Sequence, residues 1–470
     1  MQIGRISGTA PCLIDMARYL LKHATVMTMD ADYTLYEDGY VLIDGAEIRA
    51  VGPCSQLAQL DDLTGFQVLD CIGKLILPGM VNTHCHAPMV VFRSLGDDVP
   101  DRLRRYMIPL ENRIMNETVC ETAASYAMAE MLLGGVTTVC DNYAYTQQSA
   151  RAAERLHIRA VLGGPERVMP STEPDLDQEA RNLAYQKQFI QEWKGHPLVT
   201  PMAACHAPYS ESAAQLKACA DLAQEQDVLL TMHTAEMPYE VEQCRREHGV
   251  SPVEYLDQLG VLSPRFLAAH AILVDEKDIQ LMARRGVRVS HNIGSNLKSA
   301  KGVAPVASMR QAGIPVGLGS DGAMSGNTLD ILTQLPVCAK AQKTATHDRS
   351  IFPAREVLSM ATLEGARALR MEEQIGSLEP GKYADLIVLE TDSPNMCPIY
   401  DPYSAVVYSA NPSNVESVFV HGKQVVDHRK LLTADFGQLK RELLCYCDQI
   451  CAEADAIDRQ LEATPVKLAY

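Results

Sequence analysis

The sequence lacks an excess of positive charge. Its 470 residues include 42 Lys and Arg against 59 Asp and Glu, which gives a formal net charge of −17 at pH 7. Proteins that bind nucleic acid neutralise phosphates with basic side chains, so this balance argues against a nucleic-acid partner. A nucleobase or nucleoside as a small-molecule substrate is still compatible with it.

Long apolar runs are also missing. No stretch approaches the roughly 20 apolar residues that a membrane-spanning helix needs. The first segment, MQIGRISGTAPCLIDMARYLL, has no long apolar core of the kind found in signal peptides. The sequence therefore predicts a cytoplasmic protein with no membrane partner.

Paired cysteine motifs are absent, although the chain has 14 cysteines. None of them forms a C-x-x-C pair, the spacing typical of zinc ribbons and redox motifs. Cys445, Cys447 and Cys451 gather in a stretch with the periodicity of an amphipathic helix, and we interpret them as packed thiols rather than a metal cluster. Unpaired thiols fit a reducing cytoplasm.

Short strand-like runs occur near both ends of the chain, at residues 19–30, 39–52, 384–390 and 415–427. Between them, strand-like runs alternate with helical ones. We therefore expect a small composite β-sandwich domain with a C-terminal helix, built from residues 1–75 and 375–470. An α/β domain of residues 76–374 is expected to be inserted between its two parts.

The middle section contains eight strand-like runs, each apolar at first and polar at its end. They cover residues 75–86, 135–142, 158–164, 198–210, 228–236, 265–272, 287–292 and 314–322. Segments with helical periodicity separate them. Eight such units predict an α/β fold of the (β/α)8 TIM-barrel type rather than an open sheet.

Imidazole and carboxylate groups recur where these runs end. They are His84, His86, His206, His233, His270, His291 and Asp321. A single histidine at a strand end is more often a hydrogen-bonded core residue. Barrels, however, carry their active sites at the C-terminal ends of the strands, so the repeated placement favours a functional site.

Two of these histidines stand one residue apart in VNTHCHAPMV, residues 81–90. A strand points alternate side chains to the same face, so His84 and His86 are expected to point together. By itself the pair fits a metal site and two ordinary polar residues about equally well. Together with His233 and Asp321, it forms a ligand set that suits zinc and leaves one position for water.

Glu236 lies three residues after His233, in the segment HTAE. From there it can reach a water at the same metal, and we interpret it as a proton shuttle between that water and a leaving nitrogen. On position alone, a solvated or helix-capping carboxylate is the more ordinary explanation.

Five motifs, in this order, resemble the amidohydrolase superfamily in its deaminase and chlorohydrolase branch. They are PGMVNTHCH, HTAE, AAHAI, SHNIGSNLKSAKGVAPV and LGSDGAMSGNTLDI. GSLEPGKYADLIVLE is similar to the strand by which such enzymes return to their small β-domain. The resemblance extends from about residue 20 to about residue 430. It implies a hydrolase that acts on C–N bonds other than peptide bonds, those of cyclic amidines in particular.

Within that branch the sequence is most similar to the methylthioadenosine/S-adenosylhomocysteine deaminases. The resemblance implies that Glu111 holds the ribose hydroxyls and that His206, in CHAPYS, contacts the purine ring. Arg167, in RVMPS, is a further substrate-binding candidate on the ribose or carboxylate side. For Glu111, the residues alone favour an ordinary surface carboxylate on a helix.

Three details separate this chain from other relatives. Binuclear members carry a lysine on the fourth strand, and LVTPMAACHAPYS has none, so we expect one metal ion per subunit. We expect Zn²⁺, although Fe²⁺ or Mn²⁺ suits the same ligands. Glu236, which some triazine chlorohydrolases replace, is present and favours deamination. The usual Trp-Leu pair of the strand-one loop is replaced by RLRRYM, which leaves the exact substrate open.

The sequence therefore predicts a metal-dependent hydrolytic deaminase that releases ammonia from S-adenosylhomocysteine, methylthioadenosine or adenosine. Asp321 is expected to take a proton from water and Glu236 to protonate the ring nitrogen. His270 is expected to bind the substrate and hold the tetrahedral centre together with the metal. His291 is expected to orient Asp321 or close the pocket. The resemblance also implies a homo-oligomer, either a dimer or a tetramer.

Two alternatives stay open. A related deaminase or chlorohydrolase acts on another N-heterocycle, such as guanine, 8-oxoguanine, a pterin or an s-triazine. A barrel retained only for binding or structure is disfavoured, because the metal ligands and the proton-transfer residues are all present.

Overall fold

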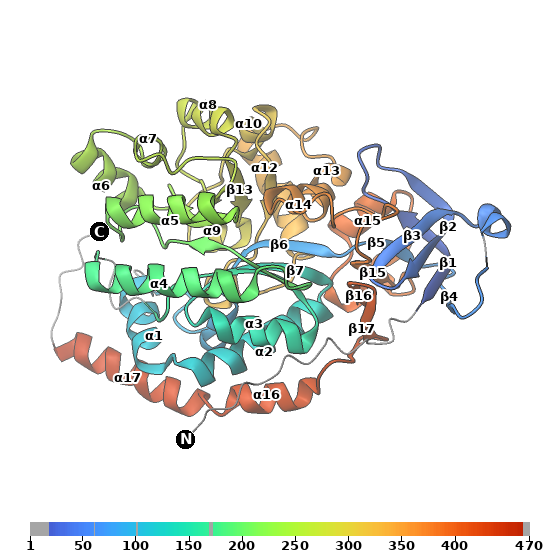
Figure 1. The fold of residues 1–470 in the computed structure, drawn as a ribbon, viewed down its shortest axis with the longest axis horizontal. Helices are drawn as coiled ribbons and strands as arrows, with labels where there is room; N and C mark the ends of the chain where they lie inside the picture. The colour runs from blue at the N-terminus through green and yellow to red at the C-terminus, as the bar shows by residue number, and fades with distance from the viewer. Residues whose placement is uncertain (1–17, 61, 100–101, 169–172, 464–470) are drawn as a thin grey trace, which may run out of the picture.

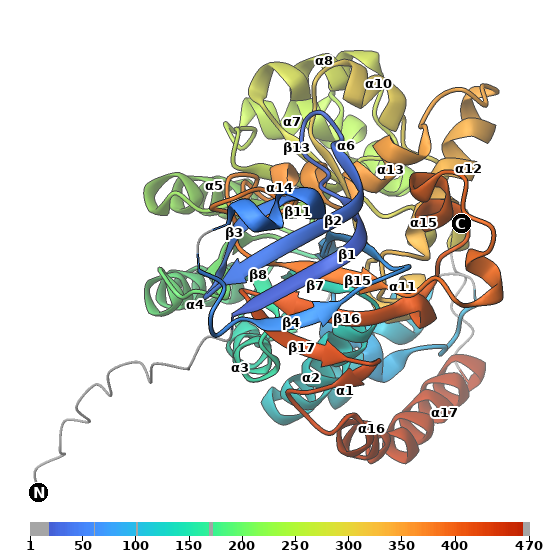
Figure 2. The ribbon, with the colours of Figure 1, turned by 90° about the vertical axis from the view of Figure 1, so that its right-hand side faces the viewer.

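The computed structural model describes residues 18–60, 62–99, 102–168 and 173–463. Figure 1 shows a barrel surrounded by helices, with a smaller sheet beside it at the right. Figure 2, seen from that side, places β1, β2 and β4 in front of the barrel. Residues 1–17 and 464–470, which belong to the two ends of the expected composite domain, lie outside the described residues.

Strands from both ends of the chain build the smaller sheet, which is mixed. They are β1 (Tyr19–Met27), β2 (Leu35–Asp44), β3 (Glu47–Pro53), β4 (Gln67–Asp70), β5 (Leu75–Pro78), β15 (Leu386–Leu389), β16 (Val415–Val420), β17 (Lys423–Asp427) and β18 (Lys430–Leu431). Their order is β18-β17-β16-β15-β5-β1-β2-β3, and β4 pairs with β1. Because β15 pairs directly with β5, the C-terminal strands complete the N-terminal ones, as the sequence predicts.

The barrel strands are parallel and follow one another along the chain. They are β6 (Met80–Cys85), β7 (Val136–Asn142), β8 (Arg159–Gly163), β9 (Val199–Pro201), β10 (Ala203–Ala204), β11 (Leu230–Thr234), β12 (Phe266–His270), β13 (Arg288–His291) and β14 (Val316–Leu318). β9 and β10 are two halves of one barrel position, interrupted at Met202. On the other side, the Asp321 amide donates to the His84 carbonyl oxygen at 3.0 Å, which brings the ends of β14 and β6 together.

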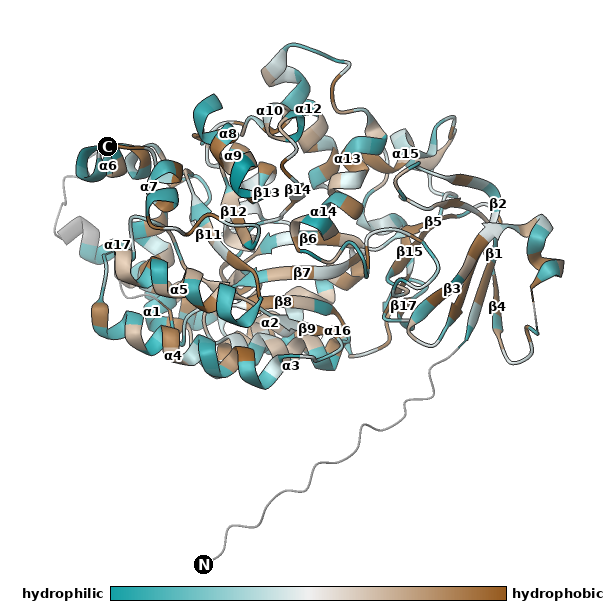
Figure 3. Ribbon diagram, turned by 45° about the horizontal axis from the view of Figure 1, so that its top comes forward, coloured by the Kyte–Doolittle hydropathy of each residue, from teal (hydrophilic) through white to brown (hydrophobic). Residues whose placement is uncertain are grey.

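Helices cover the outside of the barrel. Those up to α9 are α1 (Ile108–Ile114), α2 (Glu117–Leu133), α3 (Thr146–Leu156), α4 (Leu176–Trp193), α5 (Ala213–Gln226), α6 (Pro238–His248), α7 (Pro252–Gln258), α8 (Glu276–Arg285) and α9 (Ile293–Lys298). The others are α10 (Val306–Gln311), α11 (Ala323–Gly326), α12 (Gln334–Thr346), α13 (Ala354–Met360), α14 (Leu363–Ala368), α15 (Pro402–Tyr408), α16 (Phe436–Leu444) and α17 (Cys447–Ala463). Figure 3 shows teal and brown alternating along α4 and α5, as expected for helices with one buried face.

Short helical turns complete the described chain. They are η1 (Cys54–Gln59), η2 (Ala87–Phe92), η3 (Leu103–Met107, a π-helical turn), η4 (Pro394–Met396) and η5 (Pro412–Asn414). Helix ends follow local sequence signals: Asp275 caps the start of α8, and Gly286 ends it with a φ of +70°.

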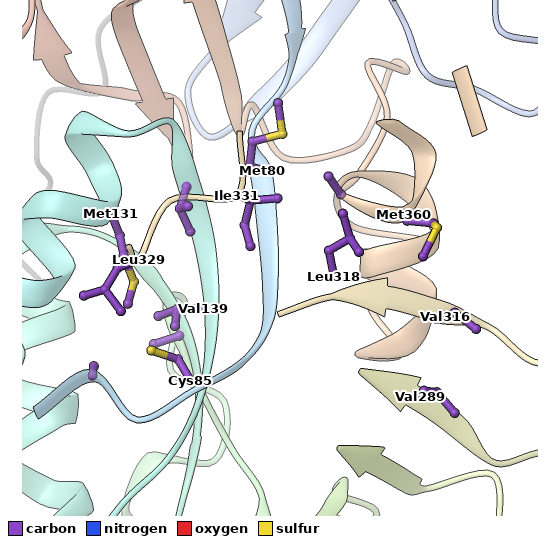
Figure 4. Close-up of a cluster of buried hydrophobic side chains, with 14 of the residues drawn as sticks. Met80, Cys85, Met131, Val139, Val289, Val316, Leu318, Leu329, Ile331 and Met360 are labelled. Carbon is purple, nitrogen blue, oxygen red and sulfur yellow. The ribbon is translucent and has the colours of Figure 1, made fainter. Parts of the chain in front are cut away.

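The main hydrophobic core lies between the barrel strands and their helices. Figure 4 shows part of it, where Cys85 of β6 lies near Val139 of β7 and Leu318 lies near Met360 of α13. Cys85 is fully buried in this cluster, whereas His84 belongs to the site described below. The barrel core thus fixes the strand that carries the first two histidines.

The expected strand over residues 75–86 is in fact two strands, which is a correction. Leu75–Pro78 belongs to the mixed sheet and Met80–Cys85 to the barrel. A Cβ on Gly79, at the junction, would lie 2.1 Å from Oγ1 of Thr137. Glycine is needed for this close approach, and the Pro78–Gly79 pair, a common turn signal, stands at the junction where the chain changes sheets.

The interpretation of the C-terminal cysteines is also wrong, because Cys445, Cys447 and Cys451 are exposed. Ile450, Ala454 and Ile457 of α17 are buried, whereas these three thiols are not. α16 and α17 lie beside α2 and α1 in Figures 1 and 2. We retain the division into residues 1–75 with 375–470 and residues 76–374 as a proposal.

A buried ion pair joins the barrel to the mixed sheet. Nε of Arg159 on β8 lies 2.7 Å from Oδ2 of Asp385, and both side chains are 2% exposed. Because Arg159→Ala leaves a buried carboxylate without its partner, we expect a loss of about 3–5 kcal/mol in the free energy of unfolding, measured by urea titration. Lys217→Ala, which breaks an exposed pair with Asp221, is the control and should change it by less than about 0.5 kcal/mol. A loss below about 1 kcal/mol for Arg159→Ala would contradict a stabilising role of this buried ion pair.

Candidate active site

Four of the predicted residues meet at the carboxyl ends of the barrel strands. His84 is on β6, His86 directly follows it, His233 is on β11 and Asp321 follows β14. One ring nitrogen from each of the three histidines lies within 4.8 Å of the other two. Nε2 of His86 is 3.1 Å from Nε2 of His233 and 3.6 Å from Oδ1 of Asp321.

The orientation of the imidazoles fits a metal site. Nδ1 of His86 bonds the carbonyl oxygen of Asn142 at 2.6 Å, and Nδ1 of His233 bonds that of His206 at 2.8 Å. Both rings therefore direct Nε2 toward the centre, as metal-binding histidines do. His84 is fully buried, and neither of its ring nitrogens has a hydrogen-bond partner among the described residues. A buried nitrogen without a partner is costly, and a metal ion at the centre would remove that cost.

The charge states also suit metal binding. Burial lowers the pKa of His84 and His86, so both rings are neutral and able to coordinate. Burial by itself raises the pKa of Asp321, but the neighbouring His270, together with the Lys301 ammonium, outweighs it and holds that pKa well below its usual range. Asp321 is therefore a carboxylate, the form that binds a cation.

A second group of possible ligands, on the mixed sheet, fits a metal less well. His23 Nδ1 lies 3.0 Å from Oδ1 of Asp38, and the Cys54 thiol donates to the Gly39 carbonyl oxygen at 3.3 Å. These groups already have hydrogen-bond partners, whereas the two ring nitrogens of His84 have none among the described residues.

Glu236 and His270 adjoin the metal cluster. Nε2 of His270 lies 3.6 Å from Oε1 of Glu236 and 3.9 Å from Oδ2 of Asp321. Nδ1 of His270 is bonded to Oδ1 of Asn296 on α9 at 2.8 Å, which directs Nε2 toward the two carboxylates. The arrangement places an imidazole between two acids that are candidates for proton transfer.

Lys301, which sequence reasoning missed, donates a hydrogen bond to Oε1 of Glu236. Both side chains are only 14% exposed. Burial raises the pKa of Glu236, but His270 and Lys301 outweigh it, so that the pKa is held well below its usual range. The motif SHNIGSNLKSAKGVAPV contains Lys301, but its spacing does not distinguish Lys301 from Lys298, which pairs with Asp97 at 2.7 Å.

The backbone around the site is unusual. Ala235, His270, Ala271 and Asp321 have φ values of +49°, +72°, +46° and +60°. Residues other than glycine seldom adopt positive φ, and such positions concentrate where function requires them. Here they reorient the chain directly before Glu236 and at two of the site's own side chains.

A cavity of about 550 Å³ adjoins the cluster, and Glu111 and His206 both line it. Oε1 of Glu111 accepts a hydrogen bond from the Tyr143 hydroxyl at 2.5 Å, and burial raises the pKa of Glu111 to about 7. Nδ1 of His206 is paired with Oγ of Ser210 at 2.7 Å, and burial lowers the pKa of His206 to about 3. The cavity wall thus offers a carboxylate and a neutral imidazole.

Two predicted residues lie apart from this group. Arg167 is exposed, donates to Gln178 at 2.7 Å and is not among the described residues that line the cavity. His291 is fully buried at the end of β13, where Nε2 lies 3.3 Å from Nε2 of Gln342. Among the described residues, no hydrogen bond joins His291 to Asp321. Their roles stay predictions.

An eight-position α/β barrel with a buried cluster of histidines and an aspartate at its strand ends defines a metal-dependent hydrolase. Residues 75–425 match the amidohydrolase family, and the chain belongs to that family. This confirms the resemblance predicted from the sequence, together with the fold class.

Several relatives are similar over most of their length. The 5-methylthioadenosine/S-adenosylhomocysteine deaminase of Syntrophobacter fumaroxidans is 39% identical over 425 residues, which are 90% of this chain and 96% of that protein. The 5'-deoxyadenosine deaminase of Methanothermobacter thermautotrophicus is 39% identical over 389 residues, 82% of this chain and 88% of that protein.

Two solved structures superpose closely on this chain. An adenosine deaminase from Xanthomonas campestris with bound zinc has a TM-score of 0.86 at 28% identity, covering 93% of this chain and 99% of that one. Atrazine chlorohydrolase from Arthrobacter aurescens, complexed with zinc, has a TM-score of 0.83 at 25% identity, covering 91% and 99%.

Proposed function

We propose that the protein is a zinc-dependent deaminase that releases ammonia from an adenosine-type nucleoside: S-adenosylhomocysteine, methylthioadenosine or adenosine. One observation carries the proposal: Glu236, a carboxylate separate from the metal ligands, lies with His270 and Asp321 beside a cavity large enough for a small ligand. The deaminases that are similar over most of this chain support the reaction and the substrate class.

His84, His86, His233 and Asp321 would hold one metal ion, and zinc is favoured because it is bound in two similar structures. Fe²⁺ or Mn²⁺ suits the same ligands. A metal bound there supplies Lewis acidity, which lowers the pKa of a bound water from about 15.7 toward 7.

The protein's own groups then divide the proton transfers. Asp321 is ionised and accepts the proton that the attacking water gives up. Nε2 of His270 lies 3.9 Å from Oδ2 of Asp321, and with both ring nitrogens protonated it would donate to the oxygen that is added to the ring carbon, since Nδ1 already donates to Asn296. Glu236 is also ionised, so it takes up the other proton of the water and delivers it to the adjacent ring nitrogen. The proton held by Asp321 passes to the amino group, which leaves as ammonia.

The competing function is hydrolysis of another amino- or chloro-substituted ring, and the similarity to atrazine chlorohydrolase favours it. Glu111 argues against this alternative, because a bare heterocycle has no ribose hydroxyls that could donate hydrogen bonds to its carboxylate. We place Glu111 on the ribose and His206 on the purine, since both line the cavity. Arg167 stays a weaker substrate-binding candidate, because it is exposed.

Glu111→Gln should raise the KM for nucleosides about 10- to 100-fold, since charge-assisted hydrogen bonds contribute about 1.5–3 kcal/mol. The KM of the unmodified enzyme should also rise as the pH falls below about 7, because Glu111 then becomes protonated and loses acceptor capacity. Initial-rate kinetics from about pH 5.5 to about pH 8.5, a range that includes the pKa of Glu111, measure both effects. An unchanged KM in Glu111→Gln would remove the nucleoside assignment.

We also propose a cytoplasmic homo-oligomer, a dimer or a tetramer. No helix among the described residues is long and apolar enough to cross a membrane. The cysteines of the described ranges are all free, which supports a reducing compartment. Light scattering coupled to size exclusion would measure the oligomeric state.

A further inference from the structure

The helix α17 lies beyond the part of the chain that matches the amidohydrolase family, which ends at residue 425. After the last strand of the mixed sheet, the chain runs back along the barrel through α16 and α17, and α17 reaches α1 (Figures 1 and 2). α1 carries Glu111. None of the roles assigned above uses α17.

An apolar stripe joins α17 to the barrel. Ile450, Ala454 and Ile457 are spaced by four and three residues, which places them on one face of the helix. They are only 4%, 7% and 4% exposed. They belong to the same hydrophobic cluster as Tyr106 of η3 and Leu110 of α1. α17 therefore covers the segment formed by η3 and α1.

Polar contacts hold the same segment at both ends. Near its start, Oδ1 of Asp458 accepts hydrogen bonds from the Tyr106 hydroxyl at 2.6 Å and from Nη2 of Arg105 at 2.8 Å. Near its end, Nη1 of Arg113 donates to Oε2 of Glu453 at 2.9 Å. Two separate points on α17 thus fix the position of the segment along the helix.

Other side chains of this segment line the cavity. Leu103, Met107 and Glu111 are among the lining residues, and Glu111 is held by the hydroxyl of Tyr143. Tyr143 belongs to the same hydrophobic cluster as the apolar stripe of α17. The segment therefore lies between α17 and the substrate cavity, and a shift on one side is transmitted to the other.

We propose that α17 positions the substrate-binding wall of the active site, with Asp458 as its central polar contact. Asp458 is a positioning residue: it acts through η3 and α1 on Glu111 without reaching the substrate. This inference rests on the proposed function in one respect, the contact between Glu111 and the substrate. The effect should fall on KM rather than kcat, because the metal ligands and Glu236 belong to other elements.

Asp458→Ala in the full-length, metal-loaded enzyme tests this proposal. We expect the KM for methylthioadenosine to rise about tenfold, with kcat and metal content within about twofold of the unmodified enzyme. Asp455→Ala is the matched control, since Asp455 is an exposed carboxylate of the same helix. Equal KM values for the two variants would overturn the proposal.

A double-mutant cycle separates positioning from a merely structural role. If Asp458 acts through Glu111, then Asp458→Ala should raise KM less than about twofold in the Glu111→Gln background. Full additivity would contradict the proposal.

Hydrogen exchange gives a readout that does not depend on activity. We expect the amides of residues 103–114 to exchange faster in Asp458→Ala than in Asp455→Ala. If the unmodified enzyme turns over no nucleoside, the proposed function fails on its own. Equal exchange in the two variants would contradict the role of α17 in either case.

Discussion

Glu236→Gln is expected to lower kcat about 10³-fold while the protein keeps its metal. The amide is nearly isosteric with the carboxylate but neither takes up nor delivers a proton at this position. Glu236 is not a metal ligand in this account, and its carboxylate oxygen lies 3.6 Å from His270. Ammonia release under saturating substrate measures kcat, and elemental analysis measures the metal.

The matched control is Glu242→Gln, an exposed carboxylate on α6, which follows the loop of Glu236. It should leave kcat and metal content unchanged. If Glu236→Gln kept more than about one tenth of the activity, proton transfer through Glu236 would be wrong, because such a group contributes about 10²–10⁴-fold.

Asp321→Asn is expected to lose both the metal and the reaction. Its carboxylate lies 3.6 Å from Nε2 of His86 and 4.0 Å from Nε2 of His84, and it is ionised. The amide removes an anionic ligand and the acceptor of the water's proton in one change. We expect activity to fall by at least about 10⁴-fold and the metal content to fall below about half an equivalent.

Glu236→Gln serves as the comparison for this variant, since it should lose most of its activity with its metal in place. Asp321→Asn with a full equivalent of metal and measurable turnover would mean that Asp321 is neither ligand nor base. In that case His84, His86 and His233 would have to hold the ion without it.

The metal cluster could be predicted because the barrel topology brings the ends of separate strands together. His84, His233 and Asp321 are far apart in the chain, but each follows an apolar run. The carboxyl ends of parallel strands meet at one rim. Only the resemblance to a family predicts a substrate-binding role for Glu111, because the residues alone favour a surface carboxylate on a helix. The structure places it at the cavity instead.

The features that were missed depend on tertiary contacts. Lys301 reaches Glu236 from the chain after α9, and no local signal separates it from Lys298 three residues earlier. The junction at Gly79 falls inside one predicted strand because the strands on both sides are buried, although Pro78–Gly79 is a common turn signal. The position of α17 on α1 depends on long-range pairs such as Asp458 with Tyr106, which periodicity cannot show.

An ammonia-release screen of the zinc-loaded enzyme distinguishes a metal-dependent deaminase of adenosine-type nucleosides from a hydrolase of bare heterocycles. The screen compares S-adenosylhomocysteine, methylthioadenosine and adenosine with guanine, 8-oxoguanine, pterins and aminotriazines. We expect kcat/KM to be at least about 100-fold higher for one of the three nucleosides than for any bare heterocycle, and activity to vanish after chelation. Turnover of only a bare heterocycle, or full activity in metal-free protein, would contradict the account.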